Sequence, residues 1–415
     1  DIDCDEKKTI PLRQRPSISL LLGAGFSVPM GYPTGRKMNQ EIQKFDELPI
    51  GFCPSGQICK GKDGNKPDFG FTNPYQKRFE CCMAIIHEYS KHKAFDYEEF
   101  MDFIQGEHVY DDIYQSIGKP YTDNNNYESL VGGMPDIYSQ MVNSLLKDTE
   151  GNSWYDNIPN HIGDYLEGPR RSYNGFLKFL HSIKDDYVVN VHTLNHDLFF
   201  ESFNKSDYIS GAICDGFEEY HSPFYGILRA DKRKYICRLK CYTGRYSGGA
   251  IRLYKLHGSI DHAVFHKTED GCLLPSCEVK LQYGIDPINL LYEKRHGTGY
   301  EKDNTYYHAD FLTGETSKIL QYNSKVFYQK MFRKFRNNLH NAKALIIIGY
   351  GGKDKGINDY IQKYFDYEHK PSYIIDSVKD KGKDNDKLKL LADKIHAKKL
   401  NIGVDGIKEN TFSIR

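Results

Sequence analysis

The segment Ser17–Gly35 reads SISLLLGAGFSVPMGYPTG and decides the expected fold. Its apolar beginning, ISLLL, is typical of a central parallel strand, which is buried on both faces. Gly23 and Gly25 follow at once, and glycine allows a sharp turn and a close backbone approach to a ligand. A helix is expected from about Arg36, and a helix N-terminus behind such a turn favours anions. The segment predicts a strand–turn–helix unit, although two glycines are also common in a turn that binds nothing.

Three later segments repeat this form of an apolar strand followed by a small polar loop. The predicted strands are Tyr187–Val191, Ile251–Leu256 and Ala344–Ile348. A fourth, Ser372–Ile375, ends at Asp376, an acid that could accept hydrogen bonds from a ribose. If these strands are parallel, their loops converge on one edge, and ligands bind in the crevice outside the carboxyl ends of such strands.

The composition limits the classes of protein that this chain can be. Its 415 residues hold 56 Lys and Arg and 56 Asp and Glu, so the formal net charge is zero. Nucleic-acid binders that rely on bulk charge usually have a basic excess, so direct nucleic-acid binding is not expected, although a local basic patch stays possible. No apolar run approaches the ~20 residues needed to cross a membrane. The 10 scattered cysteines indicate reduced thiols in a cytoplasmic protein.

We expect an α/β protein with a Rossmann-like, mostly parallel sheet, helices on both faces and a helical insertion. The expected parts are an N-terminal arm, 1–16; a sheet domain, 17–49 and 171–380; a helical insertion, 50–170; and a C-terminal helix and tail, 381–415. Segments 205–250 and 262–320 have little pattern, and 296–316 is interpreted as a surface loop or flap. The end of the chain is interpreted as a small hairpin.

Polar residues that could perform chemistry follow two of the predicted strands. Thr193, Asn195 and Asp197 lie after the second strand, and His257 follows the third. A neutral imidazole can take or give a proton near neutral pH. The alternatives are structural: Asn195 and Asp197 are also typical helix caps, and a single histidine is more often a satisfied polar residue than a catalyst.

Taken in order, these segments resemble the sirtuin-like family, and more closely its divergent bacterial branch, the NAD-consuming domains of antiphage defence systems. Four motifs carry the resemblance: G-A-G-x-S at Gly23–Ser27 with Pro33 in a following G-x-P element, T-x-N-x-D at Thr193–Asp197, K-L-H-G at Lys255–Gly258, and G-Y-G with a later Asp and Asn at Gly349–Asn358.

The resemblance implies an NAD+ glycohydrolase that cleaves NAD+ to ADP-ribose and nicotinamide in abortive infection. It implies Asn195 and His257 as catalytic residues. It also implies a set of NAD-binding residues: Gly23, Ala24, Gly25, Ser27, Pro33, Thr193, Asp197, Gly349 and, as a ribose contact, Asp376. The backbone N–H groups of Gly23–Gly25 would hold the pyrophosphate. Control by a homo-oligomer, or by a HerA-type hexameric ATPase as partner, is also implied.

Two other functions are consistent with the same resemblance. Sirtuin deacylases carry Asp-Phe-Arg after the G-x-P element and two C-x2-C pairs for zinc. Here only Arg36 is a loose substitute, and the four cysteines have other spacings and another order: Cys237, Cys241, Cys272 and Cys277. NAD-dependent deacylation is therefore less favoured, and no zinc is expected. The third possibility is a non-catalytic sensor of NAD or ADP-ribose, although a pure binder does not need His257.

Overall fold

The computed structural model describes most of the chain, in a set of ranges: 10–52, 58–61, 74–122, 126–146, 168–220, 222, 224–230, 233–266, 268–269, 272–273, 277–280, 285–293, 300–302, 306–311, 326–377 and 386–414. Parts of the predicted arm, insertion, flap and C-terminal region lie outside these ranges. Among the described residues, no helix is both long and apolar enough to span a membrane.

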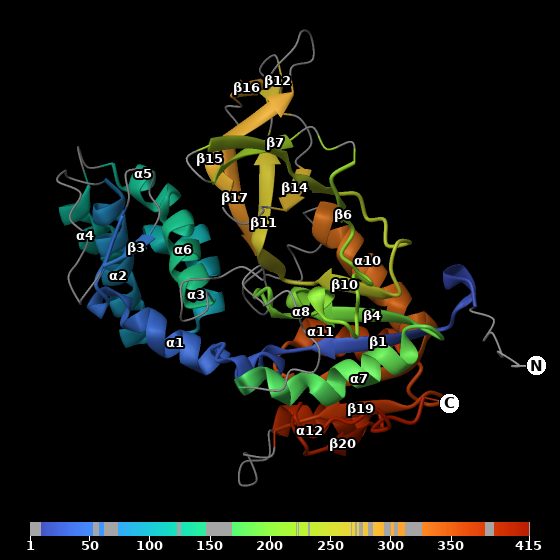
Figure 1. Cartoon of the computed structure of the whole chain (residues 1–415). Helices are drawn as coiled ribbons and strands as arrows, with labels where there is room; N and C mark the ends of the chain where they lie inside the picture. The colour runs from blue at the N-terminus through green and yellow to red at the C-terminus, as the bar shows by residue number, and fades with distance from the viewer. Residues whose placement is uncertain are drawn as a thin grey trace, which may run out of the picture.

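The centre of the molecule is a seven-stranded sheet in which every pairing is parallel. Its strands lie in the order β20 (Lys398–Leu400), β19 (Ser372–Ile375), β18 (Ala342–Ile348), β1 (Ser17–Leu22), β4 (Val188–Thr193), β10 (Ile251–Lys255) and β5 (Ile213–Cys214). The expected α/β, Rossmann-like architecture is confirmed, with the predicted first strand in the middle of the sheet (Figure 1).

Alternation along β1 explains why helices cover both faces of the sheet. Ile18, Leu20 and Leu22 belong to one apolar core, whereas Leu21 belongs to another. The first core is closed by α7 (Asn174–Ile183), α8 (Phe199–Ser202) and the last residues of the chain. The second is closed by α10 (Val326–Asn341), α11 (Lys355–Tyr364) and α12 (Asp386–Lys394). Successive side chains of a strand point to opposite faces, so a strand with apolar side chains on both faces contributes to two cores.

A helical unit with its own core leaves the sheet after the first glycine loop (Figure 1). Its elements are α1 (Gly35–Gln43), the hairpin β2 (Ile50–Phe52) and β3 (Ile58–Lys60), α2 (Pro74–His92), α3 (Tyr97–Gln105), α4 (Asp112–Gly118), α5 (Tyr127–Gly132) and α6 (Met134–Leu146). Met38 and Ile42 of α1 belong to this core. The unit therefore begins with α1 at Gly35, whereas the sequence analysis set its first residue at 50.

The segments 205–250 and 262–320, in which the sequence shows little pattern, contribute most of the strands of the antiparallel sheets. One sheet has the order β17 (Tyr306–Phe311), β11 (Gly258–His266), β14 (Cys277–Lys280), β9 (Lys240–Tyr242) and β6 (Phe217–Glu218). Another has the order β16 (Tyr300–Lys302), β15 (Ile285–Glu293), β7 (Phe224–Ala230) and β8 (Arg233–Arg238), and β12 (Thr268–Glu269) pairs with β13 (Cys272–Leu273).

This topology corrects two further predictions, the flap at 296–316 and the hairpin at the end of the chain. The predicted flap contains β16 and β17, and β20 pairs parallel with β19 instead of forming a hairpin. These strands are short, and short strands leave little periodic signal in a sequence.

Candidate functional site

The glycine loops after β1 and β18 are pressed against each other, backbone to backbone. A Cβ placed on Gly23 would lie 2.6 Å from the Gly349 carbonyl oxygen, and one on Gly25 would lie 2.9 Å from Gly349 Cα. Gly349 itself has φ +64°, and a Cβ there would lie 2.2 Å from the Phe26 nitrogen. All three glycines are therefore required by the contact between the two loops.

This contact changes the expected role of the loop N–H groups. The Gly23 N–H donates to the Ile348 carbonyl (3.0 Å), and the Gly25 N–H donates to the Gly349 carbonyl (2.9 Å). The expectation that these two groups hold a pyrophosphate is therefore wrong for this arrangement. Ala24 and Gly25 are exposed to solvent, so the outer surface of the loop is open to a ligand.

Asn195 connects the turn after β4 to the first glycine loop. Its Nδ2 donates to the Gly23 carbonyl oxygen (3.0 Å) and to Ser27 Oγ (3.1 Å). A carbonyl oxygen only accepts, so the amide nitrogen must face it and the amide oxygen points elsewhere. The backbone N–H of Asn195 donates to Thr193 Oγ1 (3.0 Å). The structure thus brings together four predicted site residues from two strand ends, with the Asn195 amide oxygen as an acceptor on a fixed side chain.

Asp197 completes this polar cluster from the same turn. Its Oδ1 accepts from the Phe199 N–H (3.0 Å), and its carboxylate accepts from the Ser27 hydroxyl. Burial raises the pKa of Asp197, and the nearby Lys255 ammonium opposes that rise. Asp197 lies one residue before Leu198, the N-cap position of α8, and its carboxylate satisfies the first N–H of that helix while it also fixes Ser27.

His257 lies immediately beyond β10, at the same edge of the sheet. Its Nε2 is 3.3 Å from Oδ2 of Asp354, and both side chains are almost fully buried. The His196 ring, between Asn195 and Asp197 in the sequence, has its centroid 6.3 Å from that of His257. The backbone of the same turn is tied to β11, because the Ile260 N–H donates to the His196 carbonyl (3.0 Å). The predicted histidine and the asparagine turn are therefore neighbours.

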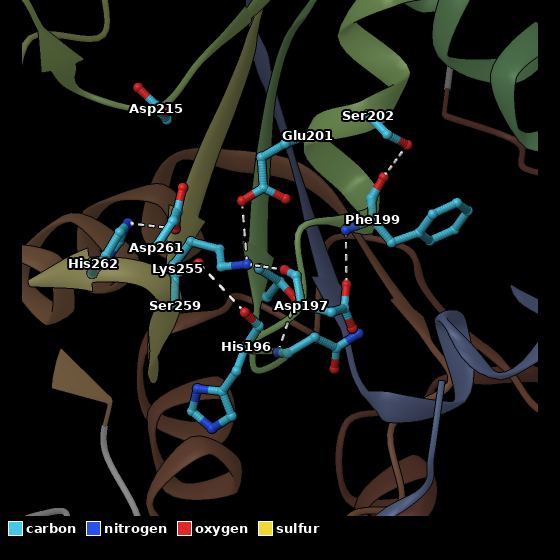
Figure 2. Close-up of polar contacts among 12 residues, drawn as sticks. His196, Asp197, Phe199, Glu201, Ser202, Asp215, Lys255, Ser259, Asp261 and His262 are labelled. Carbon is cyan, nitrogen blue, oxygen red and sulfur yellow. Dashed lines mark hydrogen bonds and ion pairs between the residues drawn. The ribbon is translucent and has the colours of Figure 1, made fainter. Parts of the chain in front are cut away.

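Figure 2 shows a group of buried charges behind this turn. Lys255 Nζ donates to the Asp197 carbonyl oxygen and lies 3.2 Å from Glu201 Oε1. Burial raises the pKa of Glu201, with Lys255 opposing the rise. Lys255 belongs to β10 and Glu201 to α8. This ion pair therefore links the two elements and fixes the turn that leads from β4 into α8.

A second buried lysine extends the charge group into the antiparallel sheet. Lys280 Nζ lies 2.7 Å from Asp215 Oδ2 and 3.4 Å from Asp261 Oδ2. Burial raises the pKa of both acids, but Lys280 and the other polar and charged groups around them together outweigh it, and both pKa values end below their usual range. His262 adjoins Asp261, and burial lowers its pKa to about 4. These carboxylates are therefore ionised partners of the lysine. Asp261 and Lys280 lie on the paired strands β11 and β14, whereas Asp215 directly follows β5 of the parallel sheet, so the Asp215–Lys280 pair links the two sheets.

Two predicted ligand residues lie away from the cluster. Asp376 follows β19 and lies 3.5 Å from Lys399 Nζ on β20, the edge strand. Pro33 precedes Thr34, whose hydroxyl caps α1 by accepting from the Lys37 N–H (3.3 Å). No described contact joins either residue to Asn195 or His257, so their assignment to the ligand site remains a prediction.

The site contains residues to which the sequence analysis gave no role. Asp354 and Lys255 were quoted only as letters of motifs, and Glu201 was not singled out. One signal was present for Glu201: an acid in the aromatic stretch LFFESF must be buried, and buried acids need a partner. Nothing in the sequence paired Asp354 with His257, because 97 residues separate them and the contact depends on the sheet order.

Two of the four cysteines considered for zinc lie side by side. Cys241 of β9 and Cys277 of β14 contact each other through their thiols, and Cys241 Sγ also donates to Ser222 Oγ (2.9 Å). Among the residues that the structure describes, no group of three or more His, Cys, Asp or Glu side chains is arranged to hold a metal ion.

No protein-family model matches the chain, and no curated protein has a significant match to it.

Proposed function

We propose that this chain is a sirtuin-like NAD+ glycohydrolase of a bacterial antiphage defence system. One observation carries the proposal: Asn195, Asp197 and Ser27 form one hydrogen-bonded cluster at the carboxyl edge of a parallel sheet, and His257 lies beside it. That edge is where α/β proteins bind nucleotides. The resemblance points to NAD+ as the substrate. The cluster offers the kind of polar groups that cleavage of NAD+ needs.

The reaction breaks the bond between C1′ of the ribose and the nicotinamide nitrogen. The electron pair of that bond stays on nicotinamide and neutralises its positive charge, while C1′ passes through an oxocarbenium-like state. Water then adds to C1′ and gives ADP-ribose. His257 takes the proton that water loses, and the amide oxygen of Asn195 orients the water or a ribose hydroxyl. A fixed acceptor is suited to this task because it needs no reorganisation during the reaction.

An enzyme that hydrolyses NAD+ without control would exhaust the NAD+ of its own cell. We therefore include control by assembly in the proposal, either as a homo-oligomer or with a HerA-type ATPase partner, in the cytoplasm. The helical unit, which has its own core beside the sheet, offers a large surface for such contacts (Figure 1).

The test is to incubate the purified protein with NAD+ and separate the products by chromatography. Wild type should yield ADP-ribose and nicotinamide, and Asn195→Ala and His257→Ala should each abolish turnover while the circular dichroism spectrum is kept. Asn204→Ala is the matched control, because the Asn204 side chain also bonds to the backbone, where it accepts from the Ile213 N–H (3.0 Å), but lies outside the cluster. Full turnover in both site variants would contradict the proposal. Tight binding of NAD+ without cleavage, with and without the ATPase, would favour the sensor function.

A further inference from the structure

The contact between His257 and Asp354 spans strands that are not neighbours. His257 follows β10 and Asp354 follows β18, and the sheet order places β4 and β1 between them. Neighbouring strands lie about 4.8 Å apart, so the two strands are separated by roughly 14 Å. The side chains nevertheless come within 3.3 Å. The two loops must therefore turn toward each other past the ends of β1 and β4, the strands whose loops carry Ser27 and Asn195.

The two carboxylate oxygens of Asp354 have different partners. Oδ1 accepts from the Ile357 N–H (3.2 Å) and caps the N-terminus of α11, whereas Oδ2 faces Nε2 of His257. Capping needs only one acceptor oxygen. An asparagine would cap this helix equally well, so the cap alone does not require a charged group at this position.

A small network fixes the loop that carries Asp354. The Tyr350 hydroxyl lies 3.0 Å from the Asp354 carbonyl oxygen and 2.9 Å from Asn358 Oδ1, and it shares its proton between these acceptors. Asn358 Nδ2 in turn donates to the Gly352 carbonyl (2.8 Å). The conformation of the loop is thus set before any substrate binds, and with it the position of Oδ2.

We infer that Asp354 is a positioning residue, whose carboxylate faces Nε2 of His257 and selects the Nε2–H form of that ring. This inference rests on the proposed NAD+ hydrolysis and adds a residue to it. A carboxylate beside a catalytic imidazole selects its tautomer and stabilises the imidazolium that forms during the reaction. The distance is longer than an ideal hydrogen bond, as is common in catalytic pairs before substrate binds.

Asp354→Asn in the full-length chain tests this inference, because it keeps the capping oxygen and removes the charge. We expect kcat for NAD+ hydrolysis to fall by about 10²-fold or more while KM stays within about threefold. Asp96→Asn is the matched control: Asp96 caps α3 in the helical unit, where its Oδ1 accepts from the Glu98 and Glu99 N–H groups. That variant should keep wild-type kcat. Wild-type kcat in Asp354→Asn would overturn the inference.

A second measurement tests the role of Asp354 without any enzyme activity. If wild type cleaves no NAD+, that result counts against the proposed function but not against this inference. Histidine ring ¹⁵N spectra of the labelled protein, with the His257 signals identified from their loss in His257→Gln, report the tautomer directly. We expect the Nε2–H form in wild type and a mixture of tautomers in Asp354→Asn. The same tautomer populations in both proteins would show that Asp354 serves only as a helix cap.

Discussion

Gly349 is the residue at which the two halves of the sheet edge meet. It combines a positive φ with a backbone contact to Gly25 and Phe26 that leaves no room for a side chain. Either feature alone is costly, and together they make this position more sensitive than an ordinary turn glycine.

Gly349→Ala should therefore lower the free energy of unfolding by about 3 kcal/mol or more. Gly31→Ala is a matched control, because Gly31 has φ +88° but no neighbouring atom within 4 Å of the place that an alanine methyl group would take. That variant should lose only about 1–2 kcal/mol, the cost of a left-handed conformation. Urea unfolding of both variants separates backbone strain from the contact between loops. Equal losses would mean that the loops can move apart.

At the scale of the element, Lys255 on β10 fixes the turn that carries Asp197 and leads into α8. Lys255→Met leaves Glu201 buried without its cation, and breaking a buried pair in this way typically costs about 3–5 kcal/mol. The loss should be smaller at pH 5 than at pH 7, since the pKa of Glu201 is already raised and rises further without the lysine, so acid relieves the buried charge.

The double variant Lys255→Met with Glu201→Gln should recover part of that stability, as a double-mutant cycle by urea unfolding would show. No recovery would mean that Lys255 acts mainly through its bond to the Asp197 carbonyl.

The sequence predicted the elements that are apolar throughout and missed those that are not. Ser372–Ile375 was predicted residue for residue, and the strand predicted at Ala344–Ile348 begins only two residues earlier, because burial on both faces leaves a strong pattern. β8 reads RKYICR and is largely exposed on both of its faces, so no alternation marks it as a strand. Its conformation depends on pairing with β7, which is tertiary information.

The candidate site divides in the same way. Asn195, Asp197 and Ser27 were singled out as polar residues at strand ends, and parallel pairing brings strand ends together. The glycines were interpreted as ligand contacts, whereas Gly23 and Gly25 are needed where one loop touches another. Which loop touches which depends on the strand order. For the same reason the partner of His257 could not be named from the sequence.

At the scale of the whole molecule, buried neutral histidines make the fold sensitive to acid. His192 in the central sheet donates through Nδ1 to the Leu20 carbonyl (3.1 Å) and accepts from Asn338 on α10 (3.0 Å). Burial lowers its pKa to about 3, and that of His262 in the antiparallel sheet to about 4. Both rings therefore stay neutral in the folded chain at pH values at which the unfolded chain binds a proton.

The free energy of unfolding should thus fall as pH drops below about 6.5, by up to about 1.4 kcal/mol per pH unit for each of these histidines. His192→Gln removes one of the two contributions. Its destabilisation relative to wild type, measured by urea unfolding at pH 7, 6 and 5, should shrink as the pH falls. A constant difference would show that His192 has the same pKa in the folded chain as in the unfolded chain.

The place of β1 in the sheet has a consequence for the newly made chain. β1 is synthesised before the other strands of the central sheet, but its two neighbours are β4 and β18, and some 320 residues separate Leu22 from Ala342. At about 5–20 residues per second, the ribosome needs roughly 15–60 s to supply that second neighbour. Throughout this interval an apolar strand has at least one unpaired edge, the kind of surface that chaperones bind and on which aggregates form. The speed of translation between the codons of β1 and those of β18 therefore sets how long the open edge of β1 in each new chain is exposed to aggregation.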